Sequence, residues 1–163
     1  MQSWLQNLDL LIKSRTPLIW IKNKEEERLL RVLDSACMRL NKKRVISWDC
    51  VNGIKGSLNE EKKFANNPKG ILNWINEQNN SVSTILLLKD FHKFYEDPTI
   101  SRLIKELSSS LKEKTHNIIF SSHIYPNSDE LDELLTIIEL PLPDHKELKK
   151  LIKNISVKTD SDL

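Results

Sequence analysis

The feature of this sequence that most limits its fold is a set of five short apolar runs separated by helix-length segments. The run at residues 84–88 has no polar alternation, which is typical of a parallel strand covered on both faces. The other runs lie at residues 18–21, 44–49, 117–121 and 136–140. Strands that alternate with helices predict an α/β three-layer sandwich with a five-stranded parallel sheet. We expect the runs at 18–21, 84–88 and 117–121 to be central, because they are the most apolar.

The segments between the runs carry apolar residues at helical spacing, which predicts helices that pack against the sheet. Asn23 and Glu26 have the spacing of a capping box and are expected to begin the helix after the first strand. Asp144 is expected to cap the last helix. The polar stretch at residues 50–68 is interpreted as a loop, in which Gly53 and Gly56 form a plain turn.

Length and composition fit one globular domain. The chain has 163 residues, of which 39% are hydrophobic and 29% charged, a balance that argues against disorder. We assign residues 1–154 to the domain and residues 155–163 to a polar tail, the expected truncation point of a longer protein. Two cysteines provide no disulfide framework. No apolar run approaches the roughly 20 residues of a membrane span, so a cytoplasmic location is expected.

The loop after the first strand is where a phosphate-binding site should be sought, because ligands of such folds bind at the carboxyl ends of the strands. Phosphate loops need glycine, yet the chain has 3 glycines, against roughly 11 at average usage. Residues 22–27 contain none, and Glu25, Glu26 and Glu27 follow one another there. Negative side chains stabilise the start of a helix but would repel a triphosphate.

Two other strand ends carry polar residues that resemble the ATP site of an AAA-type ATPase. Asp90 follows the apolar run at residues 84–88 and resembles the acid of a Walker B strand. The alternative is that Asp90 caps the turn that follows, into Phe91 and His92. Ser121 and Ser122 lie at the position of the first sensor. The segments 131–135 and 138–144 also resemble AAA sequence, so the resemblance implies a P-loop NTPase, AAA-like fold.

The resemblance also exposes what this chain lacks. Phe91 stands where an active enzyme has the glutamate that activates water, and without a base the attacking water has no proton acceptor. Thr136 follows Leu135 directly, so the family's Arg-Pro-Gly-Arg-Phe element is absent. We therefore expect no catalytic residue, and we interpret Asp90, Ser121 and Ser122 as vestigial. The four histidines show no metal-ligand spacing, so no metal site is expected.

A closer resemblance rests on four segments, at residues 25–28, 48–49, 89–94 and 100–102. They are similar to the N-terminal, degenerate AAA domain of an uncharacterised AAA ATPase family of cyanobacteria and plastid genomes. The resemblance implies an intact AAA module as protein partner, in the same or another chain. It implies Mg-ATP as cofactor of the longer protein, none for this chain, and the plastid stroma if a plastid genome encodes it.

Three functions remain open at the level of sequence. The first is a non-catalytic AAA-like domain that acts as an assembly, adaptor or regulatory module of an AAA-type ATPase. The second is an active ATP-binding NTPase with an atypical site, which the missing glycine loop disfavours. The third is a nucleic-acid-binding module that uses residues 42–44, 62–63 or the Gly53–Gly56 segment. A net charge of +2 does not favour it, since such modules concentrate basic residues on one face.

Overall fold

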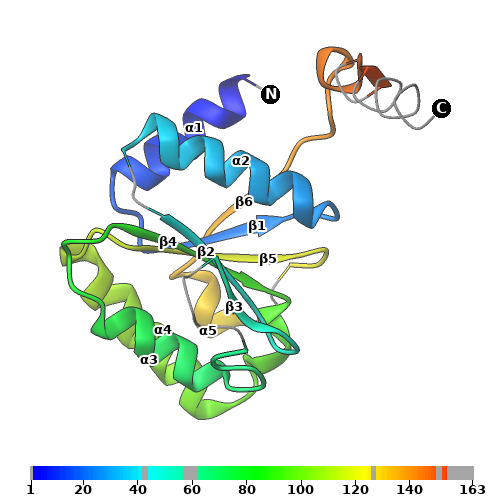
Figure 1. The fold of residues 1–163 in the computed structure, drawn as a ribbon. Coiled ribbons are helices and arrows are strands. Elements are labelled where there is room, and N and C mark those ends of the chain that lie inside the picture. Colours follow the sequence, from blue (N-terminus) through cyan, green and yellow to red (C-terminus); the bar gives the residue numbers. More distant parts are fainter. Residues whose placement is uncertain (1, 42–43, 57–61, 126–127, 150–151, 154–163) are drawn as a thin grey trace.

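The apolar runs form strands of a single sheet with helices on both faces (Figure 1). The computed structural model describes residues 2–41, 44–56, 62–125, 128–149 and 152–153. The elements are α1 (Gln2–Lys13), β1 (Leu18–Lys22), α2 (Glu26–Arg39), β2 (Arg44–Asp49), β3 (Gly53–Lys55), α3 (Pro68–Glu77), β4 (Thr84–Lys89), the 3-10 helix η1 (Phe91–Phe94), α4 (Pro98–Ser110), the 3-10 helix η2 (Leu111–Glu113), β5 (Asn117–Ser122), α5 (Asp129–Asp132) and β6 (Thr136–Glu139).

Two hydrophobic cores separate the three layers. On one face, α1 and α2 bury residues such as Leu8 and Leu33 against the sheet. On the other face, α3, α4 and α5 pack on a second core that includes Ile71 and Ile104. Strands buried on both faces need apolar residues at every position, and in β4 the five residues from Thr84 to Leu88 are buried. The expected three-layer sandwich is confirmed.

The sheet has six strands, in the order β3-β2-β4-β5-β1-β6. Strands β1, β2, β4, β5 and β6 are parallel to one another, as expected. Strands β1, β4 and β5 lie inside the sheet, which confirms the expected centre. The expectation of five strands, all parallel, was wrong because β3 adds an antiparallel edge to β2.

Strand β3 replaces the plain turn that we expected at Gly53. The Asp49 carboxylate accepts hydrogen bonds from the amides of Val51 (3.0 Å) and Asn52 (2.8 Å), which folds the chain back after β2. Gly53 has a φ of 69°, a conformation that a side chain disfavours. Ile54 then enters the core, where it is 2% exposed. The short strand forms because one buried isoleucine anchors it beside β2.

One row of large side chains crosses the sheet near its carboxyl edge. The strand register places Trp48, Leu88, Phe120, Trp20 and Ile137 side by side. The first four are fully buried, whereas Ile137 on the edge strand β6 is 40% exposed. Trp20 and Trp48 are therefore core residues. This apolar row lies directly beneath the loops at the carboxyl ends of the strands, where a ligand of such a fold would bind.

Beyond β6 the chain turns away from the sheet (Figure 1) and becomes helical at residues 145–149 and 152–153. The Asp144 carboxylate accepts hydrogen bonds from the amides of Lys146 and Glu147, both at 2.9 Å, so the expected cap is confirmed. The predicted tail at residues 155–163 lies outside the described residues. In the described part of the chain, no helix combines the length and apolarity needed to cross a membrane.

Candidate functional site at the carboxyl edge of the sheet

Asn23 organises the loop between β1 and α2, where a phosphate loop would lie. Its backbone amide donates to the Ser122 carbonyl at 2.8 Å. Its side-chain oxygen accepts from the Glu25 amide at 2.8 Å, and its side-chain nitrogen donates to the buried Ser121 hydroxyl. Asn23 is 7% exposed. These bonds close the loop directly onto β5.

The capping box predicted for Asn23 and Glu26 is not formed. Helix α2 begins at Glu26, and the preceding residue, Glu25, makes no side-chain cap. The Asn23 side chain is engaged with Ser121, on another strand, while the Glu26 carboxylate pairs with Lys89 at 3.0 Å. The Asn23 backbone amide, which would donate to Glu26 in a capping box, donates to the Ser122 carbonyl instead. The Asn23 side-chain oxygen accepts from the amide of Glu25 rather than from that of Glu26.

Asp90, the predicted Walker B acid, follows β4 directly. Its backbone has a φ of 50°, which is uncommon for a residue with a side chain. Its amide donates to the Ser121 carbonyl at 2.8 Å. Its side chain is exposed and makes no capping bond to η1, so the capping alternative is wrong.

The two predicted sensor residues are both buried and both bonded within the protein. Ser121 is 3% exposed and accepts from Asn23, while Ser122 is 4% exposed and donates to the Ile124 carbonyl at 2.6 Å. The structure therefore brings Asn23, Asp90 and Ser121 together at one strand edge. Ser121 joins the other two: its backbone carbonyl accepts from the Asp90 amide, and its hydroxyl accepts from the Asn23 side chain.

Phe91 lies in an aromatic cluster rather than at the edge of the sheet. It is fully buried, and its ring centroid lies 5.5 Å from that of Trp48 and 5.6 Å from that of Phe120. Phe94 is equally close, at 5.4 Å. A side chain at position 91 therefore points into the core.

The role of Arg28 was not predicted from the sequence. Its side chain is 9% exposed and reaches from α2 to the segment after β6. It donates to the Pro141 carbonyl at 2.7 Å and pairs with Glu147 at 3.1 Å and Glu25 at 3.4 Å. Glu147 also accepts from the Asp144 amide at 3.3 Å. An Asp-x-x-Glu pattern could have indicated this capping box, but nothing local links it to Arg28.

His92 and His123 lie beside the same edge, with ring centroids 6.3 Å apart. Burial lowers the pKa of His92; the nearby Asp90 carboxylate opposes this effect, and Lys93 and His123 add to it. Among the described residues, no three or more His, Cys, Asp or Glu side chains are arranged to hold a metal ion.

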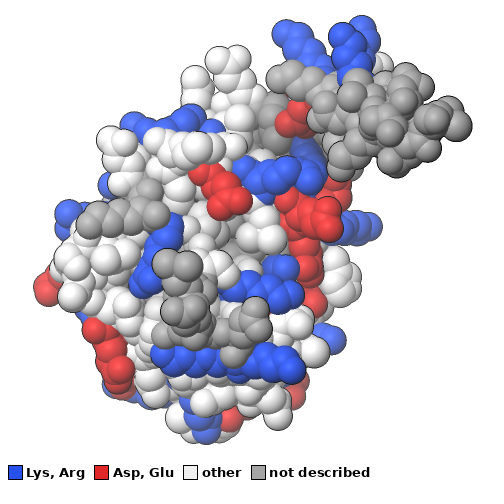
Figure 2. Space-filling view, viewed as in Figure 1, with Lys and Arg blue, Asp and Glu red and all other residues white. Residues whose placement is uncertain are grey.

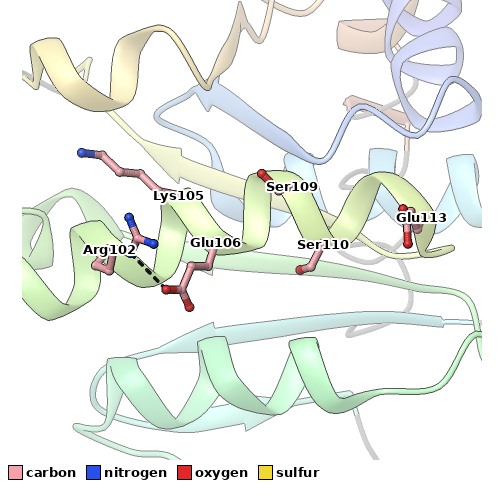
Figure 3. Close-up of a pocket in the computed structure, with 6 residues that line it drawn as sticks. All are labelled: Arg102, Lys105, Glu106, Ser109, Ser110 and Glu113. Atoms are coloured by element: carbon pink, nitrogen blue, oxygen red, sulfur yellow. Dashed lines mark hydrogen bonds and ion pairs between the residues drawn. The ribbon is translucent and has the colours of Figure 1, made fainter.

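Charge and shape distinguish the edge from the rest of the surface. A shallow depression at the start of α2 is lined by Lys24, Arg28, Arg31 and the three glutamates. Figure 2 shows acidic side chains gathered in this region and both signs of charge interspersed over the rest of the face. A second depression lies on the outer face of α4 and η2, where Arg102 pairs with Glu106 at 3.0 Å (Figure 3).

The order of the strands and the position of this edge define an AAA-like domain, and a family comparison agrees. Residues 4–140 match the family described as "SpoVK-like AAA ATPase, N-terminal domain". The chain therefore belongs to that family.

Among individual proteins, the chain is similar to those called "Uncharacterized AAA domain-containing protein ycf46". It is 32% identical to that of Guillardia theta over 153 residues, which are 94% of this chain and 30% of the relative. It is 35% identical to that of Gracilaria tenuistipitata var. liui over 146 residues, or 90% of this chain and 30% of the relative. The chain thus spans about a third of the length of these relatives.

A solved structure supports the same fold. The structure of C. elegans PCH-2 matches 87% of this chain and 43% of its own, with a TM-score of 0.58. The two sequences are 9% identical, so this likeness concerns the fold alone.

Proposed function

We propose that this chain is a non-catalytic AAA-like domain that serves as an assembly, adaptor or regulatory module for an AAA-type ATPase. Its partner would be an intact AAA module in the same or another chain. Mg-ATP would be the cofactor of that module, and the cytoplasm or the plastid stroma would be the compartment. The relatives are about three times as long as the matched region, which leaves room for such a module.

The observation that carries the proposal is the closed β1–α2 loop. A phosphate loop works because free backbone amides at a helix start point at the phosphate. Here the Glu25 amide is bonded to the Asn23 side chain, and the Asn23 amide is bonded to Ser122. These two amides have partners inside the protein and are therefore not available to a ligand.

Charge at the same place supports the proposal. Glu25, Glu26 and Glu27 stand at the start of α2, where Lys89 pairs with Glu26 at 3.0 Å and Arg28, itself shared with Glu147, pairs with Glu25 at 3.4 Å. Two unit charges about 4 Å apart repel by about 4 kcal/mol at an effective dielectric of 20. The residues present therefore do not fit a magnesium-bound triphosphate, and we derive no catalytic step for this chain.

The burial of Phe91 supports the absence of hydrolysis. A general base must lie within hydrogen-bond reach of the water that it activates. The side chain at position 91 is instead enclosed by Trp48, Phe94 and Phe120. A substituted glutamate would have to displace this cluster before it could meet solvent.

An ATP turnover assay on the purified chain tests the proposal. We expect no release of phosphate above that of buffer, with or without magnesium. The matched variant is Asp90→Asn, which changes an exposed carboxylate without disturbing the core. Steady turnover that Asp90→Asn abolishes would refute the proposal and favour an NTPase with an atypical site.

A further inference from the structure

The segment that follows β6 has the properties of a docking arm. We define the arm as the described residues of 141–153. The last bond to the sheet is that of the Leu140 amide to the Lys22 carbonyl, at 2.9 Å. The chain then passes through Pro141 and Pro143, and its helix lies beyond the edge of the sheet (Figure 1).

Arg28 fixes the direction in which the arm leaves. Its guanidinium donates to the Pro141 carbonyl at the start of the arm and to the Glu147 carboxylate in the helix, six residues further on. A planar guanidinium with several fixed donors holds its partners in a defined geometry. Since the side chain is 9% exposed, solvent screens these bonds less than those of a surface pair.

The arm presents apolar side chains that the rest of the described chain does not cover. Leu142 is 84% exposed, Leu148 42% and Ile152 66%. Leu148 and Ile152 are four residues apart, which is the spacing of neighbours on one face of a helix, and both residues are helical. Neither core cluster includes any of the three. A helix normally buries such a stripe against another element.

The charges of the arm indicate the chemistry of what covers the stripe. Lys146 and Lys149 are exposed on the same helix. Its two carboxylates, Asp144 and Glu147, are engaged by the cap and by Arg28. An apolar stripe bordered by lysines fits an apolar surface with an acidic rim.

We propose that this arm docks on the ATPase module that accompanies the domain, with Leu142, Leu148 and Ile152 as the apolar anchors and Arg28 as the residue that positions them. This inference rests on the proposed function, and it identifies the surface through which the domain would contact its ATPase module. The relatives supply the occupant, because about 70% of each lies outside the region that this chain matches.

Binding in solution tests the inference. The probe is the part of the Guillardia theta relative outside the match, purified alone, and its own matched segment is the positive control. We expect the full chain to bind the probe, with slower hydrogen exchange in the arm. Leu148→Asp and Ile152→Asp should each weaken binding at least tenfold. Met38→Asp, at a 76% exposed position on α2, should leave the affinity unchanged.

The variant Arg28→Met distinguishes the positioning of the arm by Arg28 from the contact that the apolar anchors make with the partner. This variant keeps the apolar stripe, so it should speed hydrogen exchange in the arm of the free chain and weaken binding less than Leu148→Asp does. Unchanged exchange in the arm would show that Arg28 does not position it. Circular dichroism of each variant confirms that the fold is retained.

The other outcomes each overturn a defined statement. Binding that Leu148→Asp does not weaken would reject the arm and leave the proposed function intact. Binding by the positive control but not by this chain would reject the arm as this chain's docking surface. If neither binds, both the arm and the proposed function fail. Self-association or binding to anionic phospholipid vesicles through the stripe would reject the ATPase module as its occupant.

Discussion

Asn23 is the residue on which the geometry of the carboxyl edge depends. Its side chain joins the start of α2 to Ser121 in the middle of the sheet, and its backbone bonds to Ser122. All three residues are less than a tenth exposed. A buried polar side chain that loses its partner costs free energy of folding, so this network is stable only when complete.

Replacement of Asn23 tests the network. Asn23→Ala removes both side-chain bonds and leaves the Ser121 hydroxyl without its donor. We expect the free energy of unfolding to fall by about 1–3 kcal/mol, which thermal denaturation would record as a lower midpoint. The matched control is Asn7→Ala on the exposed face of α1, for which we expect no loss. Equal midpoints for the two variants would contradict the assigned role.

At the scale of elements, η1 joins the end of β4 to the core. Phe91 is its anchor, because it is fully buried and touches aromatic rings from β2 and β5. The turn that would carry catalytic groups in an active module is thereby part of the core packing.

Truncation of Phe91 should lower the free energy of unfolding far more than truncation of its neighbour Phe94. We expect Phe91→Ala to lower the free energy of unfolding by about 3–5 kcal/mol, as is usual for a buried phenylalanine. Phe94→Ala should have a smaller effect, because Phe94 is only partly buried. Urea denaturation gives both values, and a similar loss for the two would show that η1 is anchored as a whole.

The same element should make stability depend on pH. Burial lowers the pKa of His92, so the folded protein binds its proton at a lower pH than the unfolded chain does, whose histidine has a pKa of about 6.5. The stability that comes from keeping His92 neutral in the folded protein is fully present above the pKa of the unfolded chain. It is lost as the pH falls through the lowered pKa of the folded state.

Urea midpoints measured across mildly acidic pH check this dependence. His92→Gln should reduce the loss of stability toward acid, whereas His145→Gln, at an exposed position, should leave it unchanged. If His92→Gln showed the same acid dependence as the unmodified protein, the charge of His92 would not be its source.

At the scale of the whole molecule, sequence predicted the parts of the fold that depend on local pattern. Apolar runs identified the five parallel strands, most clearly β1, β4 and β5, where burial on both faces excludes most polar residues. Strand β3 was missed, since three residues beside a glycine carry almost no periodic signal. The role of Asn23 was misread because its main partner, Ser121, lies 98 residues away.

The candidate site was predictable to the same extent, from local pattern but not from contacts between residues far apart in the sequence. Asp90, Ser121 and Ser122 could be placed at the carboxyl edge because each follows an apolar run. The contacts of Arg28 could not, since Glu147 lies 119 residues further along the chain. Residue types and strand ends can be read from sequence, whereas the partners of a buried charge depend on the folded arrangement.

The central claim is that the β1–α2 loop is closed to nucleotide, and titration calorimetry with Mg-ATP at millimolar concentrations tests it most directly. The account predicts no saturable heat for the unmodified chain. It predicts none for Asn23→Ala either, because Glu25, Glu26 and Glu27 would still repel the phosphates. Saturable binding to the unmodified chain that is lost when residues 22–27 are changed would contradict the account.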